Sequence, residues 1–162
     1  MILLYGEKFT DVDLPQVIPT CESFDARVIP LVGEDLQCLH SALRKASRGV
    51  VLKTRSRLWI SLARELRADL TIYVWGLPLR RRGVIPIYPA ADYRGPGVYY
   101  VKNRHDLRAL VGKTVDGILL DARGFDPRAV ELAVKGELRC DCVRCDVAER
   151  LLCNWYREVE VL

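Results

Sequence analysis

Five consecutive residues, Lys53-Thr-Arg-Ser-Arg57, bring together cations and hydroxyls in a way that could hold an anion. They follow an apolar, β-branched run and precede a helical pattern, so they lie where a strand leads into the amino terminus of a helix. Cations at that end oppose the helix dipole, but an anion bound among them and the free backbone N–H groups would reverse the sign. We therefore predict a phosphate or carboxylate site at Lys53, Thr54, Arg55 and Arg57. The alternative is that the arginines lie in solvent and Thr54 only caps the helix.

A second candidate segment, Asp121-Ala-Arg-Gly-Phe-Asp126, follows a strongly apolar strand pattern. Ligands of open α/β sheets bind beyond the carboxyl ends of the strands, which makes Asp121 a weak candidate for a base or metal ligand and Arg123 a candidate phosphate contact. The alternative is that Asp121 is a turn residue, as Asp126 before Pro127 is a helix cap. No histidine or second carboxylate completes an acid–base pair, and we predict neither a metal nor a cofactor.

Basic and aromatic residues also occur together, as nucleic-acid binding requires. Exposed rings can stack bases at about 1–3 kcal/mol each while arginines hold the phosphates. The residues that this hypothesis assigns to nucleic acid are Arg64, Arg67, Arg80, Arg81, Arg82, Tyr93 and Arg94. Neighbouring residues on a strand point to opposite faces, so packing of Tyr88 against Tyr99 or Tyr100 is the competing interpretation.

The cysteines favour disulfides over metal. On the helix expected at 142–154, Cys145 and Cys153 would be separated by about 12 Å of rise, too far to share a zinc ion or to bond each other. Cys153 then needs a partner from elsewhere, such as Cys21 or Cys38, and we expect at least one disulfide. The connectivity stays open among the six cysteines, which are Cys21, Cys38, Cys140, Cys142, Cys145 and Cys153.

The overall charge permits a polyanion partner without requiring one. The net charge is +4, and most of the 25 basic residues are arginines, which bind phosphates in a forked geometry. The scarcity of Asn, Gln and Met, together with six cysteines, also fits a thermophile, whose intracellular proteins do use disulfides. Neither a basic leader nor an apolar run of membrane-spanning length is present, so we expect a cytoplasmic protein that does not insert into membranes.

Strand and helix patterns alternate along the chain and predict an α/β domain. The central unit reads as a strand from Val50, a helix over 54–68 and a strand over 70–75, with Leu58, Trp59, Leu62, Ala63 and Leu66 on one apolar arc. The segments 84–88 and 98–101 read as a hairpin with a long loop. We therefore predict that residues 1–162 form a single-domain three-layer sandwich whose sheet is mostly parallel, with an antiparallel hairpin at about 84–101.

The remaining segments give further expectations about single elements. Residues 2–5 read as a strand, 8–25 as a loop, and 26–32 as a strand that Pro30 would place at a sheet edge. Helices are expected near 34–48, 103–111 and 126–135, and strands at 115–121 and 156–162.

Three functional hypotheses remain open at this point. The leading one is a protein that binds RNA or DNA through its arginine-rich helix and loop. The second is an enzyme that acts on a nucleotide or phosphorylated metabolite at the strand ends. The third is a disulfide-stabilised scaffold or homo-oligomer subunit without catalytic activity.

Overall fold

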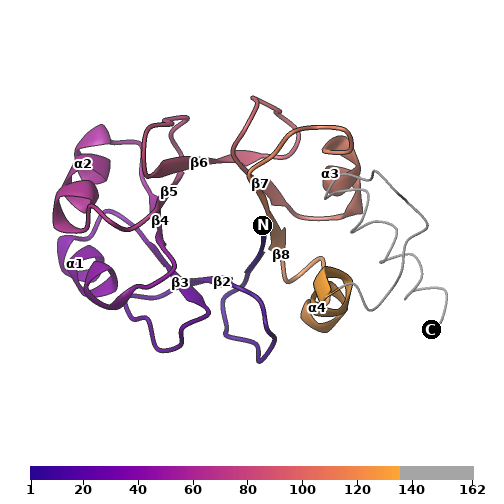
Figure 1. Cartoon of the computed structure of the whole chain (residues 1–162), viewed down its shortest axis with the longest axis horizontal. Helices are drawn as coiled ribbons and strands as arrows, with labels where there is room; N and C mark the ends of the chain where they lie inside the picture. Colours follow the sequence, from indigo (N-terminus) through magenta and orange to yellow (C-terminus); the bar gives the residue numbers. More distant parts are fainter. Residues whose placement is uncertain (136–162) are drawn as a thin grey trace.

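The strands of this chain close into a barrel. A computed structural model describes residues 1–135, and in it each strand pairs in parallel with its neighbours in chain order, from β1 to β8 and back to β1. The strands are β1 (Ile2–Tyr5), β2 (Gln16–Pro19), β3 (Val28–Val32), β4 (Val50–Lys53), β5 (Ile72–Trp75), β6 (Val84–Pro89), β7 (Val98–Val101) and β8 (Gly117–Asp121). Figure 1 shows the ring that they form.

Four helices are described, and they cover two sides of the ring. They are α1 (Leu36–Lys45), α2 (Arg57–Leu66), α3 (Arg104–Ala109) and α4 (Pro127–Lys135). Helices α1 and α2 lie next to each other on one side, while α3 and α4 lie on the opposite side (Figure 1). The strand order and parallel pairing are those of a (β/α)8 barrel, with several strand connections made by loops instead of helices.

The predicted three-layer sandwich is wrong, and so is the predicted antiparallel hairpin. Strands β6 and β7 pair in parallel, with Tyr88 opposite Tyr99, and the loop over 90–97 carries the chain back along the barrel. Parallel neighbours usually need a longer crossover that contains a helix, so a short loop rich in glycine and proline indicated a hairpin. The same closure places Pro30 opposite Ile18 inside a continuous sheet, not at an edge.

The predictions for single elements agree with the structure better than the prediction of the overall fold does. The central strand–helix–strand unit is confirmed as β4, α2 and β5, although α2 begins at Arg57 and ends at Leu66. Helix α4 begins at Pro127, directly after Asp126, as expected. Strand β2 falls within the stretch expected to be a loop, and the helix and strand expected at 142–154 and 156–162 lie outside the described residues.

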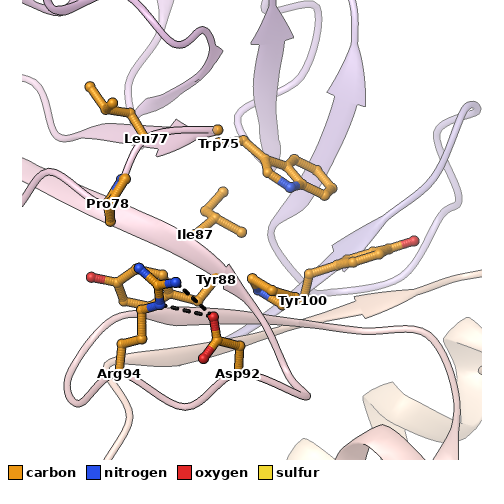
Figure 2. A pocket seen from close by; sticks show the side chains of 10 residues that line it. Trp75, Leu77, Pro78, Ile87, Tyr88, Asp92, Arg94 and Tyr100 are labelled. Carbon is orange, nitrogen blue, oxygen red and sulfur yellow. Dashed lines mark hydrogen bonds and ion pairs between the residues drawn. The ribbon is translucent and has the colours of Figure 1, made fainter.

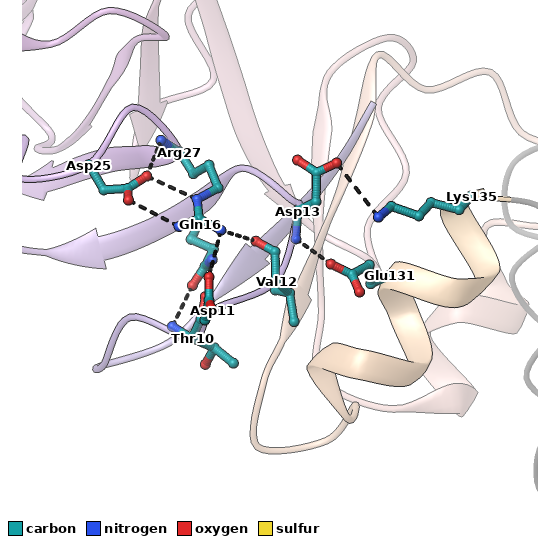
Figure 3. Close-up of polar contacts among 9 residues, drawn as sticks. All are labelled: Thr10, Asp11, Val12, Asp13, Gln16, Asp25, Arg27, Glu131 and Lys135. Carbon is teal, nitrogen blue, oxygen red and sulfur yellow. Dashed lines mark hydrogen bonds and ion pairs between the residues drawn. The ribbon is translucent and has the colours of Figure 1, made fainter.

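The long connection between β1 and β2 contains no helix, and side chains hold it in place (Figure 3). The buried Gln16 side chain exchanges two hydrogen bonds with the backbone of Thr10, at 2.9 and 2.7 Å. Arg27 donates to the Val12 carbonyl at 3.0 Å and pairs with Asp11 and Asp25. From α4, Glu131 accepts a hydrogen bond from the backbone N–H of Asp13. These bonds hold the connection against the barrel, as a helix does in other connections between strands.

The barrel interior is filled by side chains. Leu3, Val17, Ile29, Val51, Tyr73, Ile87, Val98 and Leu119 form one buried cluster, with a residue from each strand. Side chains alternate along a strand, so the residue two positions further on points inward as well, one level closer to the carboxyl ends. That level forms the mouth of the barrel.

Candidate site at the mouth of the barrel

Three aromatic rings close the barrel interior at its carboxyl end. Tyr5, Trp75 and Tyr100 lie two positions beyond the buried Leu3, Tyr73 and Val98. Their ring centroids are 5.4 Å apart for Tyr5 and Trp75, 5.8 Å for Tyr5 and Tyr100, and 4.9 Å for Trp75 and Tyr100. Edge-on and tilted contacts of this kind are favourable for aromatic side chains. All three rings remain partly exposed, so the cluster is the floor of an open surface.

A hollow of about 370 Å³ lies on one side of this cluster. Trp75 and Tyr100 line it together with Leu77, Pro78 and Ile87, and the loop between β6 and β7 contributes Asp92 and Arg94. These two side chains form an ion pair of 2.9 Å at the rim (Figure 2). An apolar hollow with a few charged groups at its edge is the common form of a small-ligand site.

A second hollow, of about 300 Å³, lies at the ends of β1 and β8. Tyr5, Lys8, Thr10, Arg123 and Pro127 are among the residues that line it. Because Tyr5 also contacts Trp75 and Tyr100, the two hollows flank one ring cluster. A chain-like ligand could therefore cross the mouth from one hollow to the other.

Asp121 ends β8 beside this cluster, and both of its carboxylate oxygens are engaged. Arg123 donates to Oδ1 from its backbone N–H at 2.9 Å and from Nε at 3.1 Å, and to Oδ2 from its guanidinium at 2.8 Å. The Tyr100 hydroxyl also donates to Oδ2. Burial would raise the pKa of Asp121, but the hydrogen bonds from Arg123 and Tyr100 outweigh it and lower the pKa to about 2.

The same contacts act on the hydroxyl of Tyr100. Burial and the adjacent Asp121 carboxylate raise the pKa of Tyr100 to about 12. At neutral pH the pair is therefore an ionised carboxylate and a neutral phenol. A carboxylate with so low a pKa is a poor proton acceptor near pH 7, so this geometry favours an anchoring role for Asp121 over the predicted role as a base. Within residues 1–135, no group of three or more metal-ligating side chains is present.

The predicted anion site divides into two parts. Thr54 is buried, and its hydroxyl donates to Glu34 at 2.6 Å and accepts the backbone N–H of Ser56 at 3.0 Å. This hydroxyl is fully occupied, and Glu34 adds a negative charge beside it. Lys53 and Arg55 are exposed, and in the described part of the chain no hydrogen bond or ion pair involves their side chains. Lys53 pairs in register with Trp75, which brings an exposed cation to the ring cluster.

Most of the residues predicted to bind nucleic acid lie at the end of the barrel opposite the mouth. Arg64 donates to the Leu70 carbonyl at 2.9 Å, just before β5, and Arg80 pairs with Asp116 at 2.6 Å, just before β8. Arg81 and Arg82 directly precede β6. These positions are at the amino ends of the strands, opposite the mouth. Arg67 bonds the carbonyls that end α1 and pairs with Asp69.

The predicted tyrosines are engaged in packing. Tyr88 and Tyr99 pack with centroids 5.4 Å apart, which confirms the competing interpretation for that pair. Tyr93 stacks on Tyr99 at 5.5 Å, and its hydroxyl donates to the Thr114 carbonyl at 2.8 Å. Arg94 is the member of the predicted set that reaches the first hollow.

The disulfide prediction is confirmed in kind. Cys21 lies two residues after the end of β2 and bonds Cys38 in the first turn of α1. The prediction that Cys21 or Cys38 pairs with Cys153 is wrong, because their bond to each other leaves neither available. Cys140, Cys142, Cys145 and Cys153 lie outside the described residues.

Sequence reasoning overlooked Tyr5 and Trp75 as site residues. A signal was available, because each is the last residue of its strand and is followed by a glycine, Gly6 or Gly76. Aromatic residues at that position of several parallel strands converge once the sheet closes.

The fold and this site together define a short all-parallel barrel with an aromatic mouth and exposed cations at its rim. Comparison with protein-family models, curated proteins and solved structures finds no match for the chain. Within residues 1–135, no helix is both long and apolar enough to cross a membrane.

Proposed function

We propose that this protein binds single-stranded nucleic acid across the mouth of the barrel. The observation that carries the proposal is the partly exposed cluster of Tyr5, Trp75 and Tyr100, which lies beside the exposed cations Lys53 and Arg55. Unpaired bases stack on aromatic rings while cations follow the phosphates, a combination that tolerates many sequences.

Further charges at the mouth support the same proposal. The Lys102 ammonium lies 5.9 Å from the centre of the Tyr100 ring, and the Arg123 side chain is 76% exposed although it also bonds Asp121. Both can contact a phosphate without giving up their present partners. In (β/α)8 barrels the ligand sites lie at this carboxyl face. By analogy, a ligand of this protein is expected to bind at the mouth.

Duplex nucleic acid fits this surface less well. Its bases are stacked inside the helix and cannot reach rings at the floor of a hollow, whereas single strands expose them. At the amino ends of the strands, Arg64 and Arg80 already have partners in the fold, and no comparable cluster of partly exposed rings accompanies the arginines there among the described residues.

The test is fluorescence anisotropy of labelled single-stranded RNA, single-stranded DNA and duplex DNA, titrated with purified protein at about 50 and 200 mM salt. We expect tighter binding of the single strands and a large loss of affinity at the higher salt, because several phosphates are neutralised. Absence of binding at the lower salt would disprove the proposal.

Two sets of variants assign the binding to the mouth. Lys53→Glu and Arg55→Glu should weaken binding and reduce the salt dependence by about one unit of log–log slope each. Lys45→Glu, at the end of α1 and distant from the mouth, is the matched control. Trp75→Leu should lower affinity by about 1–3 kcal/mol through loss of stacking. Equal losses of affinity in Lys45→Glu and Lys53→Glu would show that the nucleic acid does not bind at the mouth.

A free nucleotide is the second candidate ligand. The hollow of about 370 Å³ beside Trp75 is within the size range of small-ligand pockets. Competition of mononucleotides against the labelled strand distinguishes the two candidates. Displacement at micromolar concentration would favour the nucleotide, and displacement only by oligonucleotides would favour the strand.

A further inference from the structure

Helix α2 has a row of leucines that begins on its outer surface and borders its buried face, where Leu62 packs against the core. Its buried residues are Ile60 and Ala63, whereas Leu58 is 81% exposed and Leu66 is 40% exposed. Leu58, Leu62 and Leu66 are spaced four residues apart, which places them along one edge of the helix. The apolar arc predicted from the sequence is covered only in part, because Leu62 packs against the core whereas Leu58 and Leu66 are exposed.

A groove continues this edge toward the neighbouring helix. It has a volume of about 490 Å³ and is lined by Leu36, Gln37, His40, Leu62 and Leu66. Leu36, at the start of α1, is 57% exposed. Single exposed leucines are normal on protein surfaces, but a row that borders an apolar groove marks an interaction surface. We call this surface, made of Leu36, His40, Leu58, Leu62 and Leu66, the α1–α2 face.

We propose that the α1–α2 face binds the same face of a second copy of this chain, with the two α2 helices antiparallel about a two-fold axis. The leucines fit this arrangement. Within one helix, Leu58 and Leu66 are about 12 Å apart along the axis. A two-fold axis near Leu62 therefore brings Leu58 of each copy opposite Leu66 of the other. Leu58, the most exposed large apolar residue of the described chain, then enters the groove that Leu62 and Leu66 line.

The charges of α2 fit the same arrangement independently. Arg57, Ser61 and Glu65 form a second row with the same spacing, next to the leucines. A two-fold axis near Ser61 brings Arg57 of each copy opposite Glu65 of the other, so the rows of leucines and charges share a centre to within one residue. Parallel helices would instead put Arg57 against Arg57. Within the described residues, neither side chain has an ion-pair partner inside its own chain.

This self-complementarity is what an isologous contact requires, because every residue pair occurs twice in it. The helix pair presents a small area, so we expect a dimer that dissociates in the micromolar range, as small interfaces often do. The inference does not depend on nucleic-acid binding, since the α1–α2 face lies on the outer side of the barrel and not at its mouth (Figure 1).

Sedimentation velocity of the full chain, from about 1 to 100 µM, tests the proposal. We expect a reversible monomer–dimer equilibrium, and Leu58→Glu should raise the dissociation constant at least about 10-fold by burying a charge in the groove. Its circular dichroism should match the wild type, because Leu58 is exposed in the monomer. A wild type that stays monomeric at 100 µM, or a Leu58→Glu variant that dimerises as tightly as the wild type, would overturn the proposal.

Charge reversal tests the antiparallel register. Arg57→Glu and Glu65→Arg should each weaken the dimer several-fold, because each creates two like-charge contacts. The double variant restores opposite charges at both contacts and should recover most of the wild-type affinity. A double variant weaker than both single variants would rule out the pairing of Arg57 with Glu65 across the interface.

Discussion

Asp121 shows how one side chain ties the barrel to its mouth. It ends β8, pairs in register with Tyr5 and accepts hydrogen bonds from Tyr100 of β7 and from Arg123. Its side chain is 4% exposed and remains charged because these donors compensate for its burial. The carboxylate therefore links β8 to β7, while the backbone of the same residue pairs with β1, at the level where the aromatic rings meet.

Stability should respond to acid through this carboxylate. Its pKa is lower in the folded than in the unfolded chain, so its contribution is complete above about pH 4 and disappears as the pH falls toward 2. We expect Asp121→Asn to destabilise the protein by about 1–2 kcal/mol at pH 7, allowing for solvent around the exposed Arg123. Urea unfolding between pH 2 and 7 measures this, and the difference from wild type should shrink at the acid end. A difference that stays constant down to pH 2 would contradict it.

Gly124 is required by a close approach of two backbones. It lies in the turn after β8, and a methyl group at this position would overlap the backbone carbonyl oxygen of Lys102. Backbone atoms cannot move aside as a side chain can, so Gly124→Ala should destabilise the protein by about 1–3 kcal/mol or more. Gly33→Ala is the matched control, because nothing lies within 4 Å of the added methyl group. Thermal unfolding compares the two, and equal melting temperatures would refute the argument.

At the scale of elements, Arg67 joins the two helices that carry the α1–α2 face. It follows α2 directly, and its guanidinium donates to the carbonyl oxygens of Leu43 and Ala46, at 2.6 and 3.3 Å. These carbonyls belong to the end of α1, where backbone acceptors lack partners within the helix. A single side chain thus caps one helix from the end of the next.

Removal of this cap should loosen α1. We expect Arg67→Ala to lower the free energy of unfolding by about 1–2 kcal/mol, because the two carbonyl oxygens lose a charged donor. Hydrogen exchange should show faster exchange of amides in the last turn of α1. Arg44→Ala removes an exposed arginine of α1 itself and should change the free energy of unfolding and the exchange rates little. Unchanged exchange in Arg67→Ala would indicate that water replaces the guanidinium without loss.

At the scale of the whole molecule, the Cys21–Cys38 disulfide ties a connection without a helix to a neighbouring helix. It joins the connection that follows β2 to α1, across a sequence separation of 17. A loop of that length is expected to contribute about 3 kcal/mol by restricting the unfolded chain. The double variant Cys21→Ser/Cys38→Ser should therefore unfold at a lower urea concentration than the wild type. An unchanged unfolding midpoint would show that the bonds around Gln16 and Arg27 suffice.

The sequence predicted those parts of the fold that depend on neighbouring residues. The unit of β4, α2 and β5 was found from helical periodicity and strand length, and α4 from Asp126 before Pro127. Barrel closure was not predictable in this way, because the pairing of Ile2 with Ile118 leaves no local signal. The loops between β5, β6 and β7 lack the helices that normally reveal a parallel repeat.

The site follows the same division. The sequence context of Lys53 and Arg55 predicts that they bind an anion, which stays a prediction, whereas the packing of Tyr88 against Tyr99 is confirmed. The cluster of Tyr5, Trp75 and Tyr100 comes from three distant strands and exists only because the ring closes. The role of Leu58 was misjudged because periodicity gives the width of an apolar face but not which part of it the core covers.

The position of β1 between β2 and β8 also governs the order in which the chain can fold. During synthesis β1 emerges first, but its second neighbour emerges only when residues 117–121 are complete. Until then β1 and β7 each have an unpaired edge, which can template pairing with other chains. The segment from β3 to β5 with its two helices rests on contacts close in sequence and can form early, whereas closure requires the longest-range contacts and should be slow. A ribosome paused before β8 would thus hold an open sheet, and the risk of aggregation would be greatest in that interval.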